Sequence, residues 1–367
     1  MMTRTLQNIA LVIASIAFVF FAFEIFFRFL PVNSGLALQP VSKSQPYLKA
    51  SSNFNYVYSK GSAMQIPNKG RVNAQGFVHD EDYIFSPDKP LLAVFGDSYV
   101  EALMVPFKET ITGILHENLA SKGSAYSFAF SGAPLSQYLM WAEYAKNTYK
   151  PSAAIFVIIS NDFDESLLKY KSMPGFHYLR EINGTLSLER VDYSVSSFKR
   201  LARKSALLRY LFLNLQIENI PSFISNFFTF RTSEKKFENN MPVVAPLKKI
   251  EDSRRAINFF LEKVNFYTGL PNDKILFVVD GLRSQIYAGK EDTSSYAAQM
   301  FDFFIREAQE MGFSVVNMQQ VFQDDYKINQ KRFEFDVDYH WNSYGHEKAA
   351  GAVIKHPMFQ ALYDPAP

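Results

Sequence analysis

The sequence predicts an α/β domain built on a parallel sheet and preceded by one transmembrane helix. Three observations lead to this fold class: short apolar runs rich in β-branched and aromatic residues, helical segments between them, and one long apolar segment near the N-terminus. Strands of a parallel sheet are buried on both faces, so they read as continuous apolar runs. With 48% hydrophobic residues, the 367-residue chain has enough apolar material for one large domain or two small ones.

The first expected element is an apolar run over residues 9–30, close to the ~20 residues that a membrane-spanning helix needs. Arg4 lies before the run, which favours a cytoplasmic N-terminus and an extracytoplasmic domain, periplasmic in a Gram-negative cell. Glu24 and Arg28 are four residues apart, so they share a helix face and can pair near the interface. A cleaved signal peptide is the alternative, because NSGLALQ after Pro31 contains small residues. The length of the run and the charged pair favour an uncleaved anchor.

The chain divides into three expected parts: a cytoplasmic tip and anchor at 1–30, a juxtamembrane segment at 31–89, and the domain at 90–357. The juxtamembrane segment is polar and turn-rich, and we expect it to pack partly on the domain. Strands are expected at 91–95, 126–130, 153–159, 274–280 and 314–318. Helices are expected at 109–123, 134–150, 252–269 and 293–312, marked by capping residues, Pro or terminal Gly. This alternation predicts a parallel sheet covered by helices on both faces.

Residues 167–250 interrupt the alternation, and we expect a helical insertion there. The stretch SFKRLARKSALLRYLFLNLQI at 197–217 predicts a basic amphipathic helix, and the following segment, 220–240, is rich in Phe. The insertion either folds back on the domain or acts as a lid or membrane-surface element, since cationic residues beside large apolar ones suit a lipid interface.

Charge and cysteine content exclude several classes of function. The formal net charge is +2, from 38 Lys plus Arg against 36 Asp plus Glu, so the chain lacks the basic excess typical of nucleic-acid-binding proteins. The chain contains no cysteine, which excludes disulfides, thiolate metal sites and a Cys nucleophile.

Small and polar residues follow the first three expected strands, at the sheet edge where open parallel sheets bind ligands. The three stretches are Gly96-Asp97-Ser98, Ser131-Gly132-Ala133 and Ser160-Asn161-Asp162. Ser98 could present its hydroxyl to a shared crevice. The Ser98 N–H, the Gly132 N–H and the Asn161 carboxamide could together hold an oxyanion. Each stretch also has a plainer reading, as a turn around Ser98 or Gly132 or as a helix cap at Asn161.

A serine nucleophile needs a base to take its proton. Among six histidines, His340 is the candidate because it lies in FDVDYHWNSYGHEKAAG, at the expected start of the last helix, with Asp338 two residues before it. A carboxylate so close could orient the imidazole and stabilise the imidazolium. His79, His116 and His177 lie in an expected surface helix or irregular segments and are expected to be solvated. An Asp-x-His pair can also ligate a metal, but the sequence offers no convincing third ligand, so we expect no metal.

Four stretches, GDSYVEALMVPFKET, FSGAPLSQYL, IISNDFDES and DYHWNSYGHEKAA, resemble in order and spacing the conserved blocks I, II, III and V of the SGNH/GDSL hydrolases. The resemblance spans residues 90–355. It implies a three-layer α/β/α flavodoxin-like fold without a cofactor. It also implies that Ser98 is the nucleophile, that His340 and Asp338 are base and acid, and that Ser98, Gly132 and Asn161 form the oxyanion hole.

The last block departs from the familiar Asp-x-x-His spacing, which would place Val337 at the acid position. The Asp-x-His-Trp form is similar to membrane-anchored alginate O-acetyltransferase-like proteins, so Asp338 is the expected acid and Asp336 the fallback. We therefore expect an extracytoplasmic serine esterase acting on O-acyl esters, most simply O-acetyl groups of a glycan or other small ester. The alternatives are an O-acetyltransferase that modifies an envelope or extracellular polysaccharide, a lipase acting on phospholipids, and a non-catalytic glycan-binding or assembly protein. Membrane contact is expected through the N-terminal helix, and no nucleic-acid partner is expected.

Overall fold

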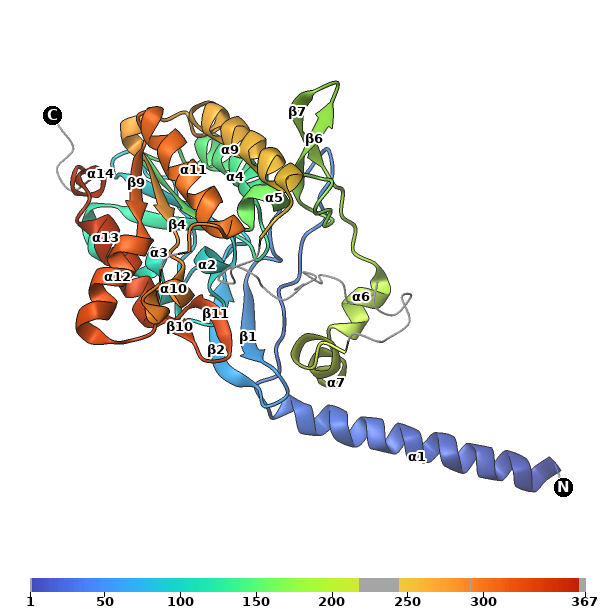
Figure 1. The fold of residues 1–367 in the computed structure, drawn as a ribbon. Helices are drawn as coiled ribbons and strands as arrows, with labels where there is room; N and C mark the ends of the chain where they lie inside the picture. Colours follow the sequence, from blue (N-terminus) through green and yellow to red (C-terminus); the bar gives the residue numbers. More distant parts are fainter. Residues whose placement is uncertain (1, 218–243, 291, 363–367) are drawn as a thin grey trace.

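The computed structural model describes residues 2–217, 244–290 and 292–362, and its centre is a five-stranded sheet (Figure 1). The strands are β3 (Leu91–Gly96), β4 (Ser124–Ala129), β5 (Ala153–Ile158), β8 (Ile275–Val279) and β9 (Ser314–Asn317). They lie in the order β4-β3-β5-β8-β9, and every neighbouring pair is parallel. The predicted parallel sheet is confirmed.

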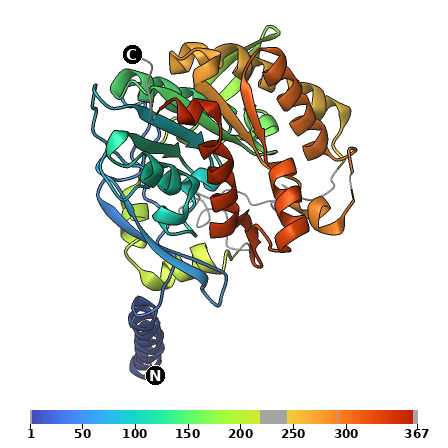
Figure 2. The same ribbon diagram turned by 90° about the vertical axis from the view of Figure 1, so that its left-hand side faces the viewer.

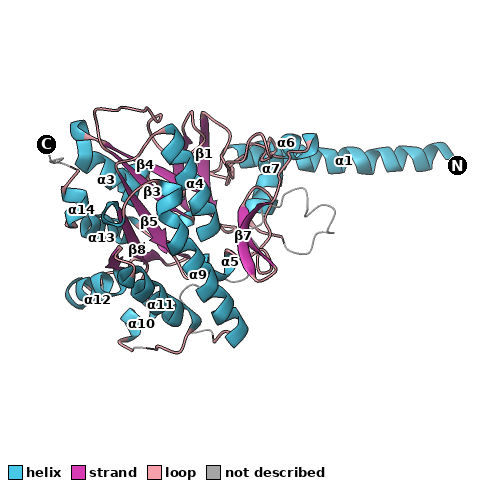
Figure 3. Cartoon of the chain, turned by 90° about the horizontal axis from the view of Figure 1, so that it is seen from above, coloured by secondary structure: helices cyan, strands magenta, loops and turns pink. Residues whose placement is uncertain are grey.

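Helices cover both faces of this sheet because side chains alternate along each strand (Figure 3). Leu92 and Val94 share a hydrophobic cluster with α3 (Ile111–Leu119), α12 (Met318–Asn329) and α13 (Ser343–Ile354). Ala93 and Phe95 belong to the opposite cluster, with α4 (Leu135–Thr148), α9 (Leu247–Thr268) and α11 (Tyr296–Glu310). A strand buried on both faces has no polar side, which explains why β3, β5 and β8 read as unbroken apolar runs.

Shorter elements complete the domain. They are α2 (Ser98–Glu101), α5 (Asp162–Glu165), α10 (Arg283–Ala288), α14 (Pro357–Gln360) and the hairpin of β10 (Glu334–Phe335) with β11 (Asp338–Trp341). His340 therefore lies on β11 and not at the start of a helix, since α13 begins only at Ser343.

Gly269 ends α9 in the left-handed conformation expected of a terminal glycine, whereas Gly123 does not end α3. The α3 helix stops at Leu119. Gly123 instead lies against Pro90, where an added Cβ would come within 2.6 Å of the Pro90 carbonyl oxygen. A close approach of two backbone segments explains this glycine.

The juxtamembrane segment contains a hairpin that the sequence did not predict. Strand β1 (Phe54–Lys60) pairs antiparallel with β2 (Gln65–Val72). Tyr56 and Val72 are buried together with Leu36 in a small cluster. Polar and apolar residues are mixed in both strands, so no clear period marks them.

The described part of the insertion differs from the expected helical layout. It contains a second hairpin, β6 (His177–Ile182) with β7 (Thr185–Arg190), whose turn at Asn183 and Gly184 has two positive φ angles. The helix expected over 197–217 is broken into α6 (Ser197–Ala202), α7 (Ala206–Arg209) and a π turn at Tyr210–Asn214. Ser205 causes the main break, because its hydroxyl accepts the Leu208 N–H and starts α7 as a separate helix. The Phe-rich stretch 220–240 lies outside the described residues.

The N-terminal helix α1 (Met2–Arg28) extends away from the domain (Figure 2). Its segment Arg4–Arg28 is long and apolar enough to cross a membrane, with a mean hydropathy of 2.6, although a signal sequence would also have these properties. The end of α1 nevertheless contacts the folded domain. Glu24 accepts hydrogen bonds from the Ser205 hydroxyl (2.7 Å) and the Leu207 N–H (3.0 Å), and Phe27 stacks on Tyr210 with ring centroids 4.1 Å apart.

Candidate active site

Ser98 lies at the point where the buried strand β3 turns into the single helical turn α2. Asp97 caps this turn by accepting the Tyr99 N–H at 2.9 Å. Gly96 makes the tight turn possible, because an added Cβ would come within 2.4 Å of Val100 Cγ2. The strand end therefore fixes the backbone that carries the Ser98 hydroxyl.

The structure brings His340 and Asp338 to this hydroxyl. Ser98 Oγ and His340 Nε2 are 2.7 Å apart, and His340 Nδ1 is hydrogen-bonded to Asp338 Oδ1. Residues two apart on a strand point to the same side, so one intervening residue suffices to join acid and base on β11. Asp336, the fallback acid, is exposed. Ser98, His340 and Asp338 thus form one hydrogen-bonded chain with the geometry of a nucleophile, a base and an orienting acid.

The charge of Asp338 controls the protonation of the imidazole. Burial by itself lowers the pKa of His340, but the adjacent Asp338 carboxylate outweighs burial and raises that pKa above its ordinary value. Burial conversely opposes ionisation of Asp338, yet His340 and Lys60 hold the pKa of this carboxyl well below its usual range. Asp338 is therefore ionised at neutral pH, and an imidazolium formed on His340 is stabilised.

The second oxygen of Asp338 is held by the hairpin that precedes the domain. Asp338 Oδ2 accepts hydrogen bonds from Tyr58 Oη at 3.1 Å and from Lys60 Nζ at 2.9 Å, both on β1. Sequence reasoning missed both residues. They lie some 280 positions from Asp338 in a segment without a motif, and nothing in their spacing points to the site.

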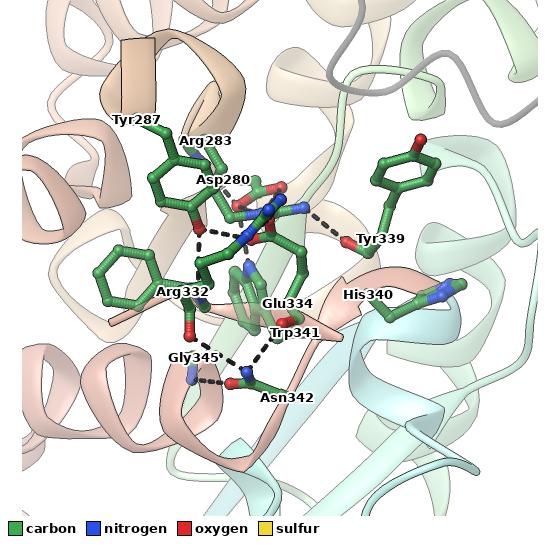
Figure 4. A network of polar contacts seen from close by, with 12 residues as sticks. Asp280, Arg283, Tyr287, Arg332, Glu334, Tyr339, His340, Trp341, Asn342 and Gly345 are labelled. Atoms are coloured by element: carbon green, nitrogen blue, oxygen red, sulfur yellow. Dashed lines mark hydrogen bonds and ion pairs between the residues drawn. The ribbon is translucent and has the colours of Figure 1, made fainter. Parts of the chain in front are cut away.

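The buried Arg283 is hydrogen-bonded to the backbone of β11 (Figure 4). Arg283 Nη1 donates to both carboxylate oxygens of Asp280, at 2.6 and 2.7 Å, and Arg283 Nε lies 3.3 Å from Glu334 Oε2. Its Nη2 donates to the Tyr339 carbonyl oxygen at 2.7 Å and to Tyr99 Oη at 2.8 Å. One guanidinium thus holds both the Tyr339–His340 peptide and the side chain of Tyr99, the residue that follows Ser98. A planar fork of five donors suits this task.

Trp341, the tryptophan of the DYHW stretch, belongs to the same network. Its indole N–H donates to Asp280 Oδ1 at 2.9 Å, and its ring is fully buried. This contact anchors the end of β11 to the end of β8, so Trp341 fixes the strand that carries His340.

The three candidate oxyanion donors follow three adjacent strands. Gly132 follows β4, Ser98 follows β3 and Asn161 follows β5, so Ser98 is in the middle of the order β4-β3-β5. Gly132 has a φ of +77°, a conformation that glycine adopts without strain, and within the described residues its N–H donates to no backbone carbonyl. Asn161 starts α5, but its side chain makes no capping hydrogen bond there, so the interpretation of Asn161 as a helix cap is wrong.

Buried carboxyl groups lie beside these donors. Burial raises the pKa of Asp97 to about 6 and that of Glu101 to about 7. Burial also raises the pKa of Asp162 well above its usual range, with Asp97 adding to the effect. Glu101 accepts the Ser131 N–H at 3.0 Å and contacts the Ser131 hydroxyl, so it holds the loop just before Gly132.

Two histidines expected to be solvated are in fact buried. His79 accepts the Glu81 N–H at 2.9 Å, and burial lowers its pKa to about 3. His177 lies 3.2 Å from Gln137 Oε1, and burial lowers its pKa to about 4. Both serve the core, because aromatic and amide neighbours enclose them and keep the rings neutral. Within the described residues, no cluster of three or more His, Asp or Glu side chains could hold a metal ion.

Comparison with solved structures finds matches at low sequence identity. The chain is similar to a member of the lipolytic G-D-S-L family from Veillonella parvula, with 11% identity, a TM-score of 0.38 and coverage of 72% of this chain and 96% of that one. It is similar to LAE5, an α/β hydrolase enzyme from a lake metagenome, with 13% identity, a TM-score of 0.41 and coverage of 76% and 98%. It is also similar to a two-domain esterase active on acetylated mannans, with 11% identity, a TM-score of 0.39 and coverage of 75% of this chain but only 50% of that one. No family model and no curated protein matches the sequence.

Proposed function

We propose that the chain is a membrane-anchored serine esterase that acts on O-acyl esters outside the cytoplasm. The observation that carries this proposal is the hydrogen-bonded chain from Ser98 Oγ through His340 to Asp338, with 2.7 Å between Ser98 Oγ and His340 Nε2. The acetyl group is the proposed acyl group because the Asp-x-His-Trp stretch resembles enzymes that handle O-acetyl esters.

In the first half-reaction, Ser98 Oγ attacks the ester carbonyl carbon while its proton moves to His340 Nε2. The carbonyl oxygen becomes an oxyanion that accepts from the Ser98 and Gly132 N–H groups and the Asn161 carboxamide. The C–O bond to the alcohol then breaks, His340 returns the proton to the departing oxygen, and the acyl group stays on Ser98. Asp338 holds the imidazole tautomer and balances the positive charge that His340 carries between these steps.

In the second half-reaction, His340 takes a proton from water, and the water oxygen attacks the acyl carbon. The bond to Ser98 Oγ then breaks, Ser98 Oγ takes the proton back from His340, and the acid is released. A sugar hydroxyl in place of this water would make the protein an O-acetyltransferase. The motif that favours this second candidate is Asp-x-His-Trp, whose tryptophan is held here by Asp280. The two activities share one acyl-enzyme and differ only in its acceptor.

The proposed anchor is α1, retained in the mature protein. The contacts of Glu24 with Ser205 and Leu207 and the stacking of Phe27 on Tyr210 support retention, because cleavage after Pro31 would remove these partners from the domain. The proposed catalytic unit includes β1 as well as residues 90–357, since β1 supplies Tyr58 and Lys60 to Asp338.

The test is hydrolysis of p-nitrophenyl acetate by the full chain in detergent micelles, beside Ser98→Ala and His340→Ala. We expect turnover by the wild type, its loss in both variants, and labelling of Ser98 by a fluorophosphonate. Folded wild-type protein that neither turns over the ester nor reacts with the fluorophosphonate would refute the catalytic proposal and favour a glycan-binding or assembly role. A faster reaction with long-chain phospholipid esters than with acetyl esters would replace the proposed substrate class.

A further inference from the structure

A lysine from the insertion contacts both sides of the candidate oxyanion site. Lys171 Nζ donates to the Gly132 carbonyl oxygen at 2.8 Å and pairs with Glu165 Oε2. The Lys171 side chain is largely buried, with 14% of its surface exposed. A buried ammonium is held in place by such partners, because it cannot exchange them for water without cost.

Glu165 extends this contact to the second donor. Glu165 Oε2 accepts a hydrogen bond from Asn161 Nδ2 at 3.0 Å. Lys171 and Glu165 therefore form a bridge from the backbone of Gly132, after β4, to the side chain of Asn161, after β5. The bridge spans the strand end that carries Ser98, because β3 lies between β4 and β5.

The bridge constrains the orientation of each donor. Glu101 holds the Ser131 N–H on one side of the Ser131–Gly132 peptide, and Lys171 holds the Gly132 carbonyl on the other. The peptide between these two contacts carries the Gly132 N–H, and a glycine with positive φ would otherwise let it rotate. At Asn161, the carboxylate of Glu165 accepts an N–H and repels the amide oxygen, so it selects one of the two carboxamide orientations.

We propose that Lys171 is a positioning residue of the oxyanion site. It orients the Gly132 N–H directly and the Asn161 carboxamide through Glu165, so that both donors point toward the same developing negative charge. This inference rests on the proposed function. Lys171 also neutralises Glu165, whose unpaired charge would otherwise lie next to the oxyanion. Donors aimed at the transition state act on kcat more than on substrate binding.

The test compares Lys171→Met with Lys169→Met in the full chain. Lys169 lies two residues earlier in the same segment and pairs with Asp252, so it is a matched control. Because loss of one oxyanion donor costs about 10²- to 10³-fold in kcat, we expect Lys171→Met to lower kcat by roughly 10- to 100-fold with little change in KM, and Lys169→Met to behave as the wild type. Lys171→Arg, which keeps the charge and the donors, should recover most of the loss.

Two further measurements separate positioning from folding. In an Asn161→Ala background, Lys171→Met should have a smaller effect than in the wild type, because one of the two donors that it positions is gone. The acid limb of the pH profile, set by His340, should stay in place. Equal kcat values for Lys171→Met and Lys169→Met in an active enzyme would overturn the inference and leave the proposed function intact, whereas an inert wild type would refute both. If Lys171→Met does not fold, a Lys171→Arg enzyme with wild-type kcat supports the bridge, and one as slow as Asn161→Ala overturns it.

Discussion

The two sides of Ser98 are built differently. On the base side, His340 and Asp338 are 8% and 3% exposed, and the network behind them includes the fully buried Arg283. On the oxyanion side, Gly132 and Asn161 are only half-buried. The difference follows from what each side must do in the proposed reaction: the base side must hold His340 and Asp338 in one geometry, whereas the oxyanion side must admit an ester carbonyl before it can stabilise the charge on it. The base side is therefore enclosed, and the oxyanion side is more accessible.

The largest expected effect comes from removing the proton-transfer pair. Ser98→Ala or His340→Ala should lower kcat by roughly 10⁴- to 10⁶-fold, since the two groups act as a unit. The double variant should lose no more than the single ones, as measured by steady-state hydrolysis of p-nitrophenyl acetate. A double variant much slower than either single one would show that Ser98 and His340 act independently, and would contradict a proton-transfer pair.

The second largest expected effect is a loss of stability when the buried Arg283 behind the base side is replaced. Arg283→Met would leave Asp280 buried without its cation and Glu334 paired with Arg332 alone, and should lower the free energy of unfolding by about 3–5 kcal/mol. Denaturant unfolding followed by Trp fluorescence measures this loss. The control is Arg306→Met, because Arg306 is exposed and its ion pair with Asp302 should contribute at most about 1 kcal/mol. Similar losses for the two variants would show that Arg283 does not stabilise β11 more than an exposed arginine stabilises its helix.

On the oxyanion side, Asn161→Ala should slow catalysis without a comparable loss of stability. One donor contributes on the order of 3 kcal/mol to transition-state stabilisation, so kcat should fall roughly a hundredfold. Steady-state kinetics test this against Asn118→Ala, an exposed asparagine of α3. A loss of less than about threefold would remove Asn161 from the proposed site.

The smallest expected effect is a shift in pH dependence. His340 must be neutral to accept a proton, so activity falls as the pH drops through its raised pKa. Lys60 opposes that rise through its positive charge, and Lys60→Met should therefore raise the pKa of His340 further and move the acid limb of kcat/KM to higher pH. Lys69→Met, on the neighbouring strand, should leave the limb in place. An unchanged acid limb in Lys60→Met would show that Lys60 does not act on the Asp338–His340 pair, and a shift to lower pH would contradict the expected sign.

The sequence predicted the parts of the fold that depend on local pattern. Runs such as LLAVF are apolar at every position because both faces are buried, and Gly96-Asp97-Ser98 directly follows one of them. The sequence also carried the Asp-x-His spacing, since a strand places alternate residues on one side.

The residues that support the site were not predictable in this way. Lys60, Arg283 and Lys171 each meet the site through contacts between distant segments, and a single basic residue in a polar stretch has no periodic signature. The hairpin β1–β2 escaped prediction because its two strands mix polar and apolar residues, so their burial depends on the domain beneath them.

The position of Lys60 has a consequence for proteolytic release. A protease that cuts near residue 31 would release the folded domain without α1 and with Lys60 still hydrogen-bonded to Asp338. A cut between residues 61 and 89 would break the covalent link between β1 and the domain. Only non-covalent contacts would then keep Lys60 next to Asp338. A fragment beginning at residue 90 would keep all four sequence blocks and lack Tyr58 and Lys60. Where the polypeptide is cut would therefore decide whether the released protein keeps the contacts of Tyr58 and Lys60 with Asp338.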